Sequence, residues 1–376
     1  MKIGIVCYPT FGGSGVVATE LGMALADKGH EVHFITYNQP VRLDFFTHKL
    51  HFHEVLLEEY PLFQYQPYEL ALSSKMVEVV QKNNLEVLHV HYAIPHAYAA
   101  YMAKQMLAEK NIKIKVVTTL HGTDITLVGS HPTYKTAVEF SINNSDVVTS
   151  VSNNLKETTN KLFNIEKDIK VVYNFIDIDK YDKAQQTECK RGALAKPNER
   201  ILTHISNFRP VKRVEDVIKV FYKVNKEIPS KLLMIGEGPD RIKAENLANK
   251  LNISDDVLFL GNSNEVAKIL CYSDVFLLPS ETESFGLAAL EAMAANTPVI
   301  STNTGGLPEV NIHGETGFLS NLGDVDDMAK NTISLLKHEE TLLVFKQKAK
   351  QHTKKFALEN ILPVYEDIYK SCHVKV

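Results

Sequence analysis

The sequence predicts an α/β protein with two domains, each built on a doubly wound parallel sheet. The chain has 376 residues, and because single hydrophobic cores stop growing at about 250–300 residues, two domains are expected. In each half, short apolar runs alternate with helix-length segments, which is the pattern of a parallel sheet covered by helices on both faces. The pattern is complete once in the first half and restarts near residue 200.

The first half begins with a strand–helix–strand unit. Residues 2–8 form a short apolar run, and a helical pattern follows from Gly15 until Gly29-His30, where residues 31–36 read as a second strand. Further strands are predicted at residues 87–91, 115–119 and 146–149. We assign this first domain to residues 1–168.

The second half repeats the alternation. Residues 214–224 are predicted as an amphipathic helix. Strands are predicted at residues 200–205, 231–235, 257–260, 274–278 and 298–301. We assign the second domain to residues 169–355. Residues 356–376 read as a C-terminal helix that we expect to cross back to the first domain.

Composition narrows the class of protein. Hydrophobic residues make up 44% and charged residues 23%, with a formal net charge of -4, so the basic excess of a general nucleic-acid binder is missing. No apolar stretch approaches the ~20 residues of a transmembrane helix, and the N-terminal apolar run is too short for a signal peptide. The four cysteines form no metal-ligand spacing. We expect a cytoplasmic protein without a metal.

A glycine-rich loop follows the first predicted strand. Gly13-Ser14-Gly15-Val-Val-Ala18 matches the G-x-G-x-x-A pattern of dinucleotide sites. A nicotinamide site also needs an acidic residue at the end of the second strand, and that strand ends in Thr36-Tyr37-Asn38. A tight turn alone is a second interpretation. The pattern favours a third, a loop whose helix start faces an anionic or hydroxylated ligand.

Two more candidates lie at predicted strand ends in the first half. His121 follows the strand ending at Thr119, and Tyr92 follows the strand 87–91. Open α/β sheets bind ligands at the carboxyl ends of their strands, so His121 and Tyr92 are placed to contact a substrate. An ordinary loop histidine is the alternative for His121.

The stronger signal lies in the second half. Glu283 follows the apolar strand 274–278, and Glu291 lies eight residues later in a run of strong helix formers. Both carboxylates can accept hydrogen bonds from sugar hydroxyls, and the free N–H groups from Phe285 to Ala288 can hold a phosphate. A capped helix with surface acids would explain Glu283 but not a carboxylate at position 291, inside an apolar stretch. Arg209 and Lys212, in the loop after residue 205, could neutralise a pyrophosphate.

Together these residues resemble the retaining GT-B glycosyltransferases of the large family that includes sucrose and mycothiol-precursor synthases. The resemblance covers nearly the whole chain, and its most specific part is the pair Glu283 and Glu291. The other motifs that carry it are Gly12-Gly13-Ser14-Gly15, His121-Gly122, Arg209 with Lys212, Gly236-Glu-Gly238-Pro, Gly305-Gly306-Leu-Pro-Glu309 and Gly314-Glu-Thr-Gly317. The resemblance implies two Rossmann-like domains that face a cleft.

Two N-terminal segments narrow the resemblance. MKIGIVCYPTFGGSGVVATELG and HVHYAIPHAYAA look like the branch of the family that moves N-acetylglucosamine from UDP-N-acetylglucosamine to L-malate, the first step of bacillithiol synthesis. The resemblance implies a UDP-sugar as substrate, no cofactor and no metal. It also implies retention of configuration without an enzymic base, and it leaves a homo-oligomer open.

The resemblance also assigns roles within the site. Its catalytic group is Glu283, His121, Arg209 and Lys212, with His121 at the 6-hydroxyl of the sugar. Many relatives place the arginine where this chain has Asn207, so Arg209 fills that role from a shifted position. The loop after Leu260 would read the uracil. The donor-binding set is Gly13, Asn207, Arg209, Lys212, Glu283, Ser284, Phe285, Gly286, Leu287 and Glu291, with Arg209 and Lys212 at the diphosphate and Glu291 at the ribose.

The acceptor is assigned to the first half. Malate is a dianion, and the helix start at Ser14 offers N–H donors to it, while Tyr92 and Thr119 end neighbouring strands. Arg42 is weighed as a counter-ion and as an ordinary surface arginine. Three alternatives stay open: a related transferase with another sugar or acceptor, a nicotinamide-dependent oxidoreductase, and a nucleotide-sugar-binding module without catalysis.

Overall fold

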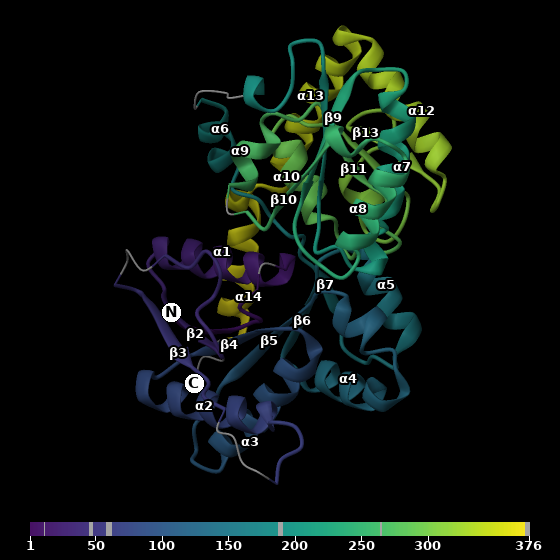
Figure 1. Cartoon of the computed structure of the whole chain (residues 1–376). Coiled ribbons are helices and arrows are strands. Elements are labelled where there is room, and N and C mark those ends of the chain that lie inside the picture. Colours follow the sequence, from purple (N-terminus) through teal and green to yellow (C-terminus); the bar gives the residue numbers. More distant parts are fainter. Residues whose placement is uncertain (11, 45–47, 58–61, 187–190, 264, 373–376) are drawn as a thin grey trace. The chain divides into compact units, whose positions relative to one another are not determined.

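The computed structural model describes residues 1–10, 12–44, 48–57, 62–186, 191–263 and 265–372. These residues form two compact units, unit 1 (residues 1–174 and 359–376) and unit 2 (residues 175–358). Each unit holds one parallel sheet flanked by helices (Figure 1). The predicted α/β fold with two Rossmann-like parallel sheets is therefore confirmed. No helix in the described ranges combines the length and the apolar character needed to cross a membrane.

Unit 1 is built on a seven-stranded sheet in the order β3-β2-β1-β4-β5-β6-β7. Its strands are β1 (Lys2–Val6), β2 (Glu31–Thr36), β3 (Leu50–Glu54), β4 (Val87–His91), β5 (Lys115–Leu120), β6 (Val147–Ser150) and β7 (Ile169–Val171). Its helices are α1 (Gly13–Asp27), α2 (Tyr68–Asn83), η1 (Ala93–Ala97), α3 (Tyr98–Ala108), η2 (Thr123–Leu127), α4 (Pro132–Asn144), α5 (Asn153–Leu162) and α14 (Leu358–Cys372).

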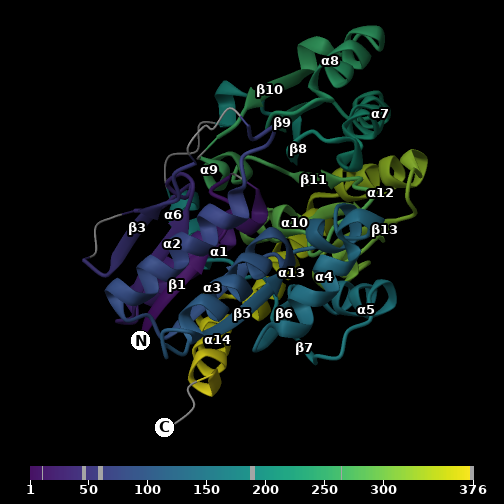
Figure 2. The ribbon, with the colours of Figure 1, turned by 90° about the horizontal axis from the view of Figure 1, so that it is seen from below.

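Helices cover both faces of this sheet. One apolar core joins the sheet to α2 and α3, which run side by side in Figure 2 and pack on Val6, Leu88 and Val116. On the opposite face α1 packs closely, because a Cβ at Gly22 would lie 2.3 Å from the ring of Phe34. The burial of alternate residues on both faces explains why these strands read as continuous apolar runs.

Unit 2 is built on a six-stranded sheet in the order β10-β9-β8-β11-β12-β13. Its strands are β8 (Arg200–Ile205), β9 (Ser230–Ile235), β10 (Val257–Gly261), β11 (Val275–Leu278), β12 (Val299–Thr302) and β13 (Gly317–Ser320). Its helices are α6 (Ile178–Gln186), η3 (Arg191–Ala193), η4 (Pro210–Lys212), α7 (Val214–Asn225), α8 (Arg241–Lys250), η5 (Ser254–Asp256), α9 (Val266–Leu270), α10 (Leu287–Ala294), α11 (Leu307–Val310), α12 (Val325–Lys337), α13 (Glu339–Thr353) and η6 (Lys354–Phe356).

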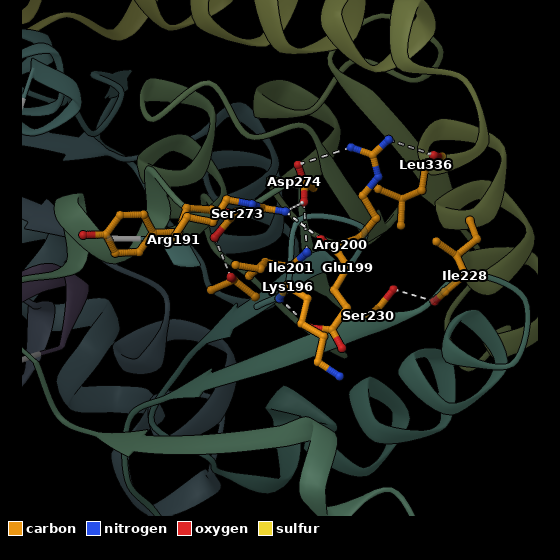
Figure 3. A network of polar contacts seen from close by, with 12 residues as sticks. Arg191, Lys196, Glu199, Arg200, Ile201, Ile228, Ser230, Ser273, Asp274 and Leu336 are labelled. Atoms are coloured by element: carbon orange, nitrogen blue, oxygen red, sulfur yellow. Dashed lines mark hydrogen bonds and ion pairs between the residues drawn. The ribbon is translucent and has the colours of Figure 1, made fainter. Parts of the chain in front are cut away.

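The amino ends of two central strands in unit 2 are tied together by one buried carboxylate (Figure 3). Asp274, just before β11, accepts hydrogen bonds from the backbone N–H of Ile201 at 2.9 Å and from the guanidinium of Arg191 at 2.8 Å. Burial alone would raise the pKa of Asp274, but Lys346, the Ile201 amide and Arg191 together hold that pKa below its usual range. A cavity of about 460 Å³ lies beside this network. It is at the amino ends of the strands, so we treat the network as a structural tie between β8 and β11.

Candidate functional sites in the two units

Each sheet contains one point where the winding of the chain reverses. In unit 1 this point lies between β1 and β4, and in unit 2 between β8 and β11. The loops that leave the carboxyl ends of such strands diverge, which makes room for a ligand. The residues predicted for binding lie on these loops, on the loop after β5, or in the strands and helices that these loops join, as Glu291 does in α10. Each unit therefore presents its own candidate site.

In unit 2 the loops after β8 and β11 are tied together by a charged pair. The ammonium of Lys212 lies 2.5 Å from Oε1 of Glu283, and the backbone N–H of Glu281 donates to the carbonyl of Val211 at 2.8 Å. Both charged side chains are only partly exposed, 20% for Lys212 and 14% for Glu283. The two residues that sequence assigned to diphosphate and sugar thus lie in direct contact, 71 positions apart in the chain.

Glu283 is held from two further directions. The hydroxyl of Ser280 donates to the same Oε1 atom at 2.9 Å, and the backbone N–H of Gly306 donates to the carbonyl of Glu283 at 2.8 Å. Gly305 lies at φ +58°, and a Cβ there would stand 2.0 Å from that carbonyl, so only glycine allows the loop after β12 to approach so closely. These contacts fix the carboxylate and leave its Oε2 atom for a ligand.

The segment after Glu283 opens α10. Ser284 and Phe285 precede Gly286, which takes φ +99°, and the helix begins at Leu287. The first N–H groups of a helix have no partner within the helix, and the positive end of its dipole favours anions. The predicted phosphate-binding amides of Ser284 to Leu287 therefore lie beside the Lys212–Glu283 pair, at the carboxyl ends of the strands of unit 2.

Glu291 has the polar partner that its position in an apolar helix demanded. The phenolic hydroxyl of Tyr181, from α6, donates to Oε1 of Glu291 at 3.1 Å, and Tyr181 is 3% exposed. Sequence reasoning missed Tyr181, because the two residues are 110 positions apart and no motif surrounds the tyrosine. The contact orients Glu291.

The loop after β8 carries cations in two different situations. Arg213 is held by Asp216, with its Nη2 atom 2.5 Å from the carboxylate. Arg209 and Asn207 are exposed, and Arg209 makes no side-chain hydrogen bond or ion pair with any residue that the structure describes. Arg209 is thus a cation available to an anionic ligand.

A buried histidine fixes the shape of this loop. His204 accepts the hydroxyl proton of Ser206 at Nε2, 2.8 Å away, and donates from Nδ1 to the carbonyl of Leu277 at 2.8 Å. Ser206 in turn accepts the backbone N–H of Phe208 at 3.2 Å, and Phe208 holds the strained value φ +38°. Burial lowers the pKa of His204 to about 4, so the neutral ring that this arrangement needs persists at physiological pH.

In unit 1 the loops after β1 and β4 meet through two hydroxyl groups. The hydroxyl of Ser14, in the first turn of α1, lies 2.6 Å from that of Tyr92. Tyr92 holds φ +88°, and its backbone N–H donates to the carbonyl of Thr119 at 2.9 Å. A Cβ at Gly15 would lie 2.5 Å from the carbonyls of Tyr8 and Thr10, so Gly15 serves packing. Gly13 is exposed at the helix start.

His121 belongs to a cluster of buried imidazoles. Its Nε2 atom lies 2.8 Å from Nδ1 of His91, and Nε2 of His91 is buried without a partner. An orphaned N–H inside a protein is rare, so we place the His91 proton on Nδ1, from which it donates to His121. The proton of His121 then resides on Nδ1. Burial lowers the pKa of His121 to about 3, which makes it a neutral hydrogen-bond donor.

Asp124 holds the loop around His121 and was not singled out from the sequence. Its carboxylate accepts the backbone N–H groups of Ala93 at 2.8 Å, Gly122 at 2.9 Å and His121 at 3.2 Å. Burial raises the pKa of Asp124 to about 6 against the effect of these hydrogen bonds. The only signal in sequence was its place three residues after His121. Asp124 thereby joins the loops after β4 and β5.

Two other residues considered for the acceptor are engaged within unit 1. The hydroxyl of Thr119 lies 2.7 Å from both Nε2 of His89 and the hydroxyl of Thr149, and Thr119 is 1% exposed. In this structure the Thr119 hydroxyl is thus part of the interior, and the residue supports Tyr92 through its carbonyl. Arg42 donates to Glu20 at 3.1 Å.

Two parts of the sequence interpretation reach beyond the described residues. The loop expected to read the uracil begins at Gly261 and includes residue 264, which lies outside them. Cys189 also lies outside. Cys7, Cys271 and Cys372, which are described, form no disulfide with one another.

The sequence family "Glycosyltransferase Family 4" matches residues 11–180, and "Glycosyl transferases group 1" matches residues 185–352. The chain is 51% identical over 370 residues to N-acetyl-alpha-D-glucosaminyl L-malate synthase of Bacillus anthracis, a match that covers 98% of this chain and 96% of that protein.

Solved structures agree on the fold. Sucrose-phosphate synthase from Thermosynechococcus elongatus superposes with a TM-score of 0.80 at 21% identity, over 99% of this chain and 98% of that one. Anabaena HepE in complex with UDP-glucose superposes with a TM-score of 0.81 at 18% identity, over 99% of this chain and 100% of that one.

Proposed function

This chain belongs to glycosyltransferase family 4, and on that premise we propose that it transfers N-acetylglucosamine from UDP-N-acetylglucosamine to the hydroxyl of L-malate, the first step of bacillithiol synthesis. The observation that carries this proposal is the full-length match to the Bacillus anthracis enzyme, whose name contains both parts of the product. That name also specifies an α linkage. Because the donor carries its sugar in α linkage, the reaction would retain configuration.

The donor would be held by unit 2. A diphosphate needs cations and N–H donors, and the exposed Arg209, the ammonium of Lys212 and the first amides of α10 lie on one sheet edge. The diphosphate would draw Lys212 away from Glu283, which then accepts hydrogen bonds from sugar hydroxyls. Glu291, oriented by Tyr181, would accept the ribose hydroxyls.

The acceptor would be held by unit 1. The amides at the start of α1, around Gly13 and Ser14, suit a carboxylate of malate. The linked hydroxyls of Ser14 and Tyr92, 2.6 Å apart, supply one further donor. Burial raises the pKa of Tyr92 well above its usual value, so its phenol stays protonated and can donate.

Transfer breaks the bond between the sugar C1 and the β-phosphate oxygen and forms a bond from C1 to the malate hydroxyl oxygen. The hydroxyl proton would pass to the leaving phosphate oxygen, because the nearby groups of unit 1 make poor bases. The pKa of His121 is lowered to about 3. The charge on the leaving diphosphate would then be stabilised by Arg209, Lys212 and the N-terminus of α10.

Two further statements belong to the proposal. The enzyme would act in the cytoplasm, where both substrates are metabolites. It would need neither a cofactor nor a metal for transfer, because the cations of unit 2 can take over the neutralisation of the diphosphate.

The test is a direct assay of product. The purified chain is mixed with UDP-N-acetylglucosamine and, separately, with malate, lactate, glycerate or citrate, and mass spectrometry follows the glycoside and free UDP. We expect a glycoside with malate and one UDP released for each glycoside formed. Product only with another hydroxy acid would contradict malate as the acceptor. Absence of UDP release with every acceptor would contradict the donor.

A further inference from the structure

A group of metal-binding side chains lies at the outer edge of the sheet in unit 1, apart from the loops described above. Glu31 and His33 belong to β2 and His51 to β3, and their ligand atoms all lie within 4.8 Å of one another. Substrate loops leave the carboxyl ends of the strands, whereas Glu31 is the first residue of β2. The group therefore has no place in the proposed transfer reaction.

The strand geometry brings these side chains onto one face. Residues two apart on a strand point the same way, which aligns Glu31 with His33 and His51 with His53. In the parallel pairing of β2 and β3, His33 lies opposite His51. The four side chains thus share a face of two neighbouring strands, and β3 is one of the two edge strands of the sheet.

The distances suit a transition-metal ion. Nε2 of His33 lies 3.1 Å and Nε2 of His51 lies 3.7 Å from Oε1 of Glu31. Ligand atoms around a tetrahedral zinc ion stand about 3.3 Å apart, because zinc–nitrogen bonds are about 2.0–2.1 Å long. Small rotations of the side chains would close the difference, and His51, whose side chain is 40% exposed, is free to make them.

His53 supplies the second contact that metal-binding histidines usually have. Its Nε2 atom lies 2.8 Å from Nδ1 of His33. A histidine that binds a metal through one ring nitrogen commonly donates its other N–H to a nearby acceptor, and this contact fixes its ring and tautomer. When Nδ1 of His33 carries the proton and donates it to Nε2 of His53, the Nε2 atom of His33 offers its lone pair toward Glu31 and His51.

The charges of the group also suit a cation. Lys2 binds Oε2 of Glu31 at 3.2 Å and leaves Oε1 turned to the histidines. The group thus combines a carboxylate oxygen with the buried imidazole of His33.

We propose that Glu31, His33 and His51 bind a divalent transition-metal ion of the zinc, cobalt or nickel class, with His53 as the residue that orients His33. A ligand set of two imidazoles and one carboxylate favours these ions over magnesium or calcium, which prefer oxygen ligands. The ion would join β3 to β2 and so protect an edge strand of the sheet. Solvent would complete the coordination at the exposed side of His51.

The test uses the full-length chain without an affinity tag. Co²⁺ is titrated into wild type and variants, and the visible absorption of the ion reports both binding and geometry, with Zn²⁺ competing for the same site. We expect one equivalent of Co²⁺ to give a tetrahedral spectrum and Zn²⁺ to abolish it. His51→Ala should lose the spectrum, and His53→Ala should weaken binding about 10–100-fold.

A matched control comes from the same segment. His48 is exposed and lies outside the group, so His48→Ala should bind Co²⁺ as wild type does. Equal losses in His48→Ala and His51→Ala would show an adventitious site on exposed histidines and overturn the proposal, as would a wild type without a tetrahedral spectrum. Transfer activity of His51→Ala should match that of wild type, so failure of the metal site leaves the proposed function untouched.

Discussion

The two points where the sheets reverse their winding differ in charge. In unit 2 the site is charged, with the Lys212–Glu283 pair and the exposed Arg209 beside the start of α10. In unit 1 the equivalent loops present neutral groups, the hydroxyls of Ser14 and Tyr92 and the imidazole of His121. The same topology has therefore been given two chemistries, one suited to a diphosphate and the other to orienting a hydroxylated ligand.

The difference also concerns how each site is held. Unit 2 uses ionic and backbone contacts between loops, such as Lys212 with Glu283 and Gly306 with the carbonyl of Glu283. Unit 1 uses buried neutral rings, with His91 against His121, together with one buried carboxyl group, Asp124, which accepts three backbone N–H groups. Changes to charge should therefore act mainly on the first site, and changes to pH mainly on the stability of the second.

The largest effect is expected from the cations of unit 2. Arg209→Ala and Lys212→Ala should each lower kcat by about 10²–10³, because each removes charge that stabilises the leaving diphosphate. Arg213→Ala is the matched control, since this neighbour is bound to Asp216, and it should change kcat by less than about threefold. Steady-state kinetics with thermal unfolding of each variant checks this. Equal losses in all three would contradict a specific role for the pair.

A smaller effect is expected in unit 1. Ser14→Ala should raise KM for malate by about tenfold, the cost of one hydrogen bond to a charged ligand, with little change in KM for UDP-N-acetylglucosamine. Tyr92→Phe tests whether Ser14 acts through its phenol partner and should give a similar rise. KM measured for both substrates decides the matter. If Ser14→Ala raised KM for both substrates equally, the assignment of the acceptor to this loop would be contradicted.

A third effect concerns the stability of the two units as a function of pH. Four fully buried histidines of unit 1 have lowered pKa values: about 3 for His89 and His121, about 4 for His96, and a value well below the usual one for His91. Among the described residues of unit 2, His204 is the one such fully buried ring. Above pH 6.5 these rings are neutral in both the folded and the unfolded chain. As pH falls from 6.5 toward 4, only the unfolded chain gains protons, so each ring costs about 1.4 kcal/mol per pH unit.

Asp124 acts in the opposite direction. Its folded pKa is about 6, so the folded carboxyl is protonated first as pH falls, which adds stability and offsets about one histidine. Unit 1 should still lose protection before unit 2. Hydrogen exchange of peptides from β4–β5 and β8–β11 at pH 7 and pH 5, corrected for intrinsic rates, measures this. Parallel loss of protection in the two sheets would contradict the assignment.

The strands that sequence reasoning missed share one property. The ten predicted runs all became strands, whereas β3, β7 and β13 were not predicted. Each of the three lies at an end of its sheet and pairs with only one neighbouring strand. An edge strand is short and less apolar, as in Ile169-Lys170-Val171, so it carries a weak pattern. Central strands are buried on both faces, so each is marked in the sequence by a clear apolar run.

The site residues likewise divide into those that local sequence predicts and those that only the fold reveals. Lys212 and Glu283 were predicted because each follows an apolar strand, and adjacency of β8 and β11 brings them together. Tyr181 and His91 act through contacts 110 and 30 positions away in the chain. Nothing local marks such partners, since their importance comes from the fold. The roles assigned to the ligand-facing residues stay predictions until a ligand is seen on them.

The central claim is that unit 2 holds the donor nucleotide, and hydrogen exchange with UDP tests it most directly. UDP should slow exchange in residues 206–213 and 281–291, around Lys212 and the first amides of α10, while residues 12–18 in unit 1 exchange as before. Arg209→Ala should reduce this protection and Arg213→Ala should preserve it. Protection confined to unit 1, or none near α10 at saturating UDP, would contradict the account.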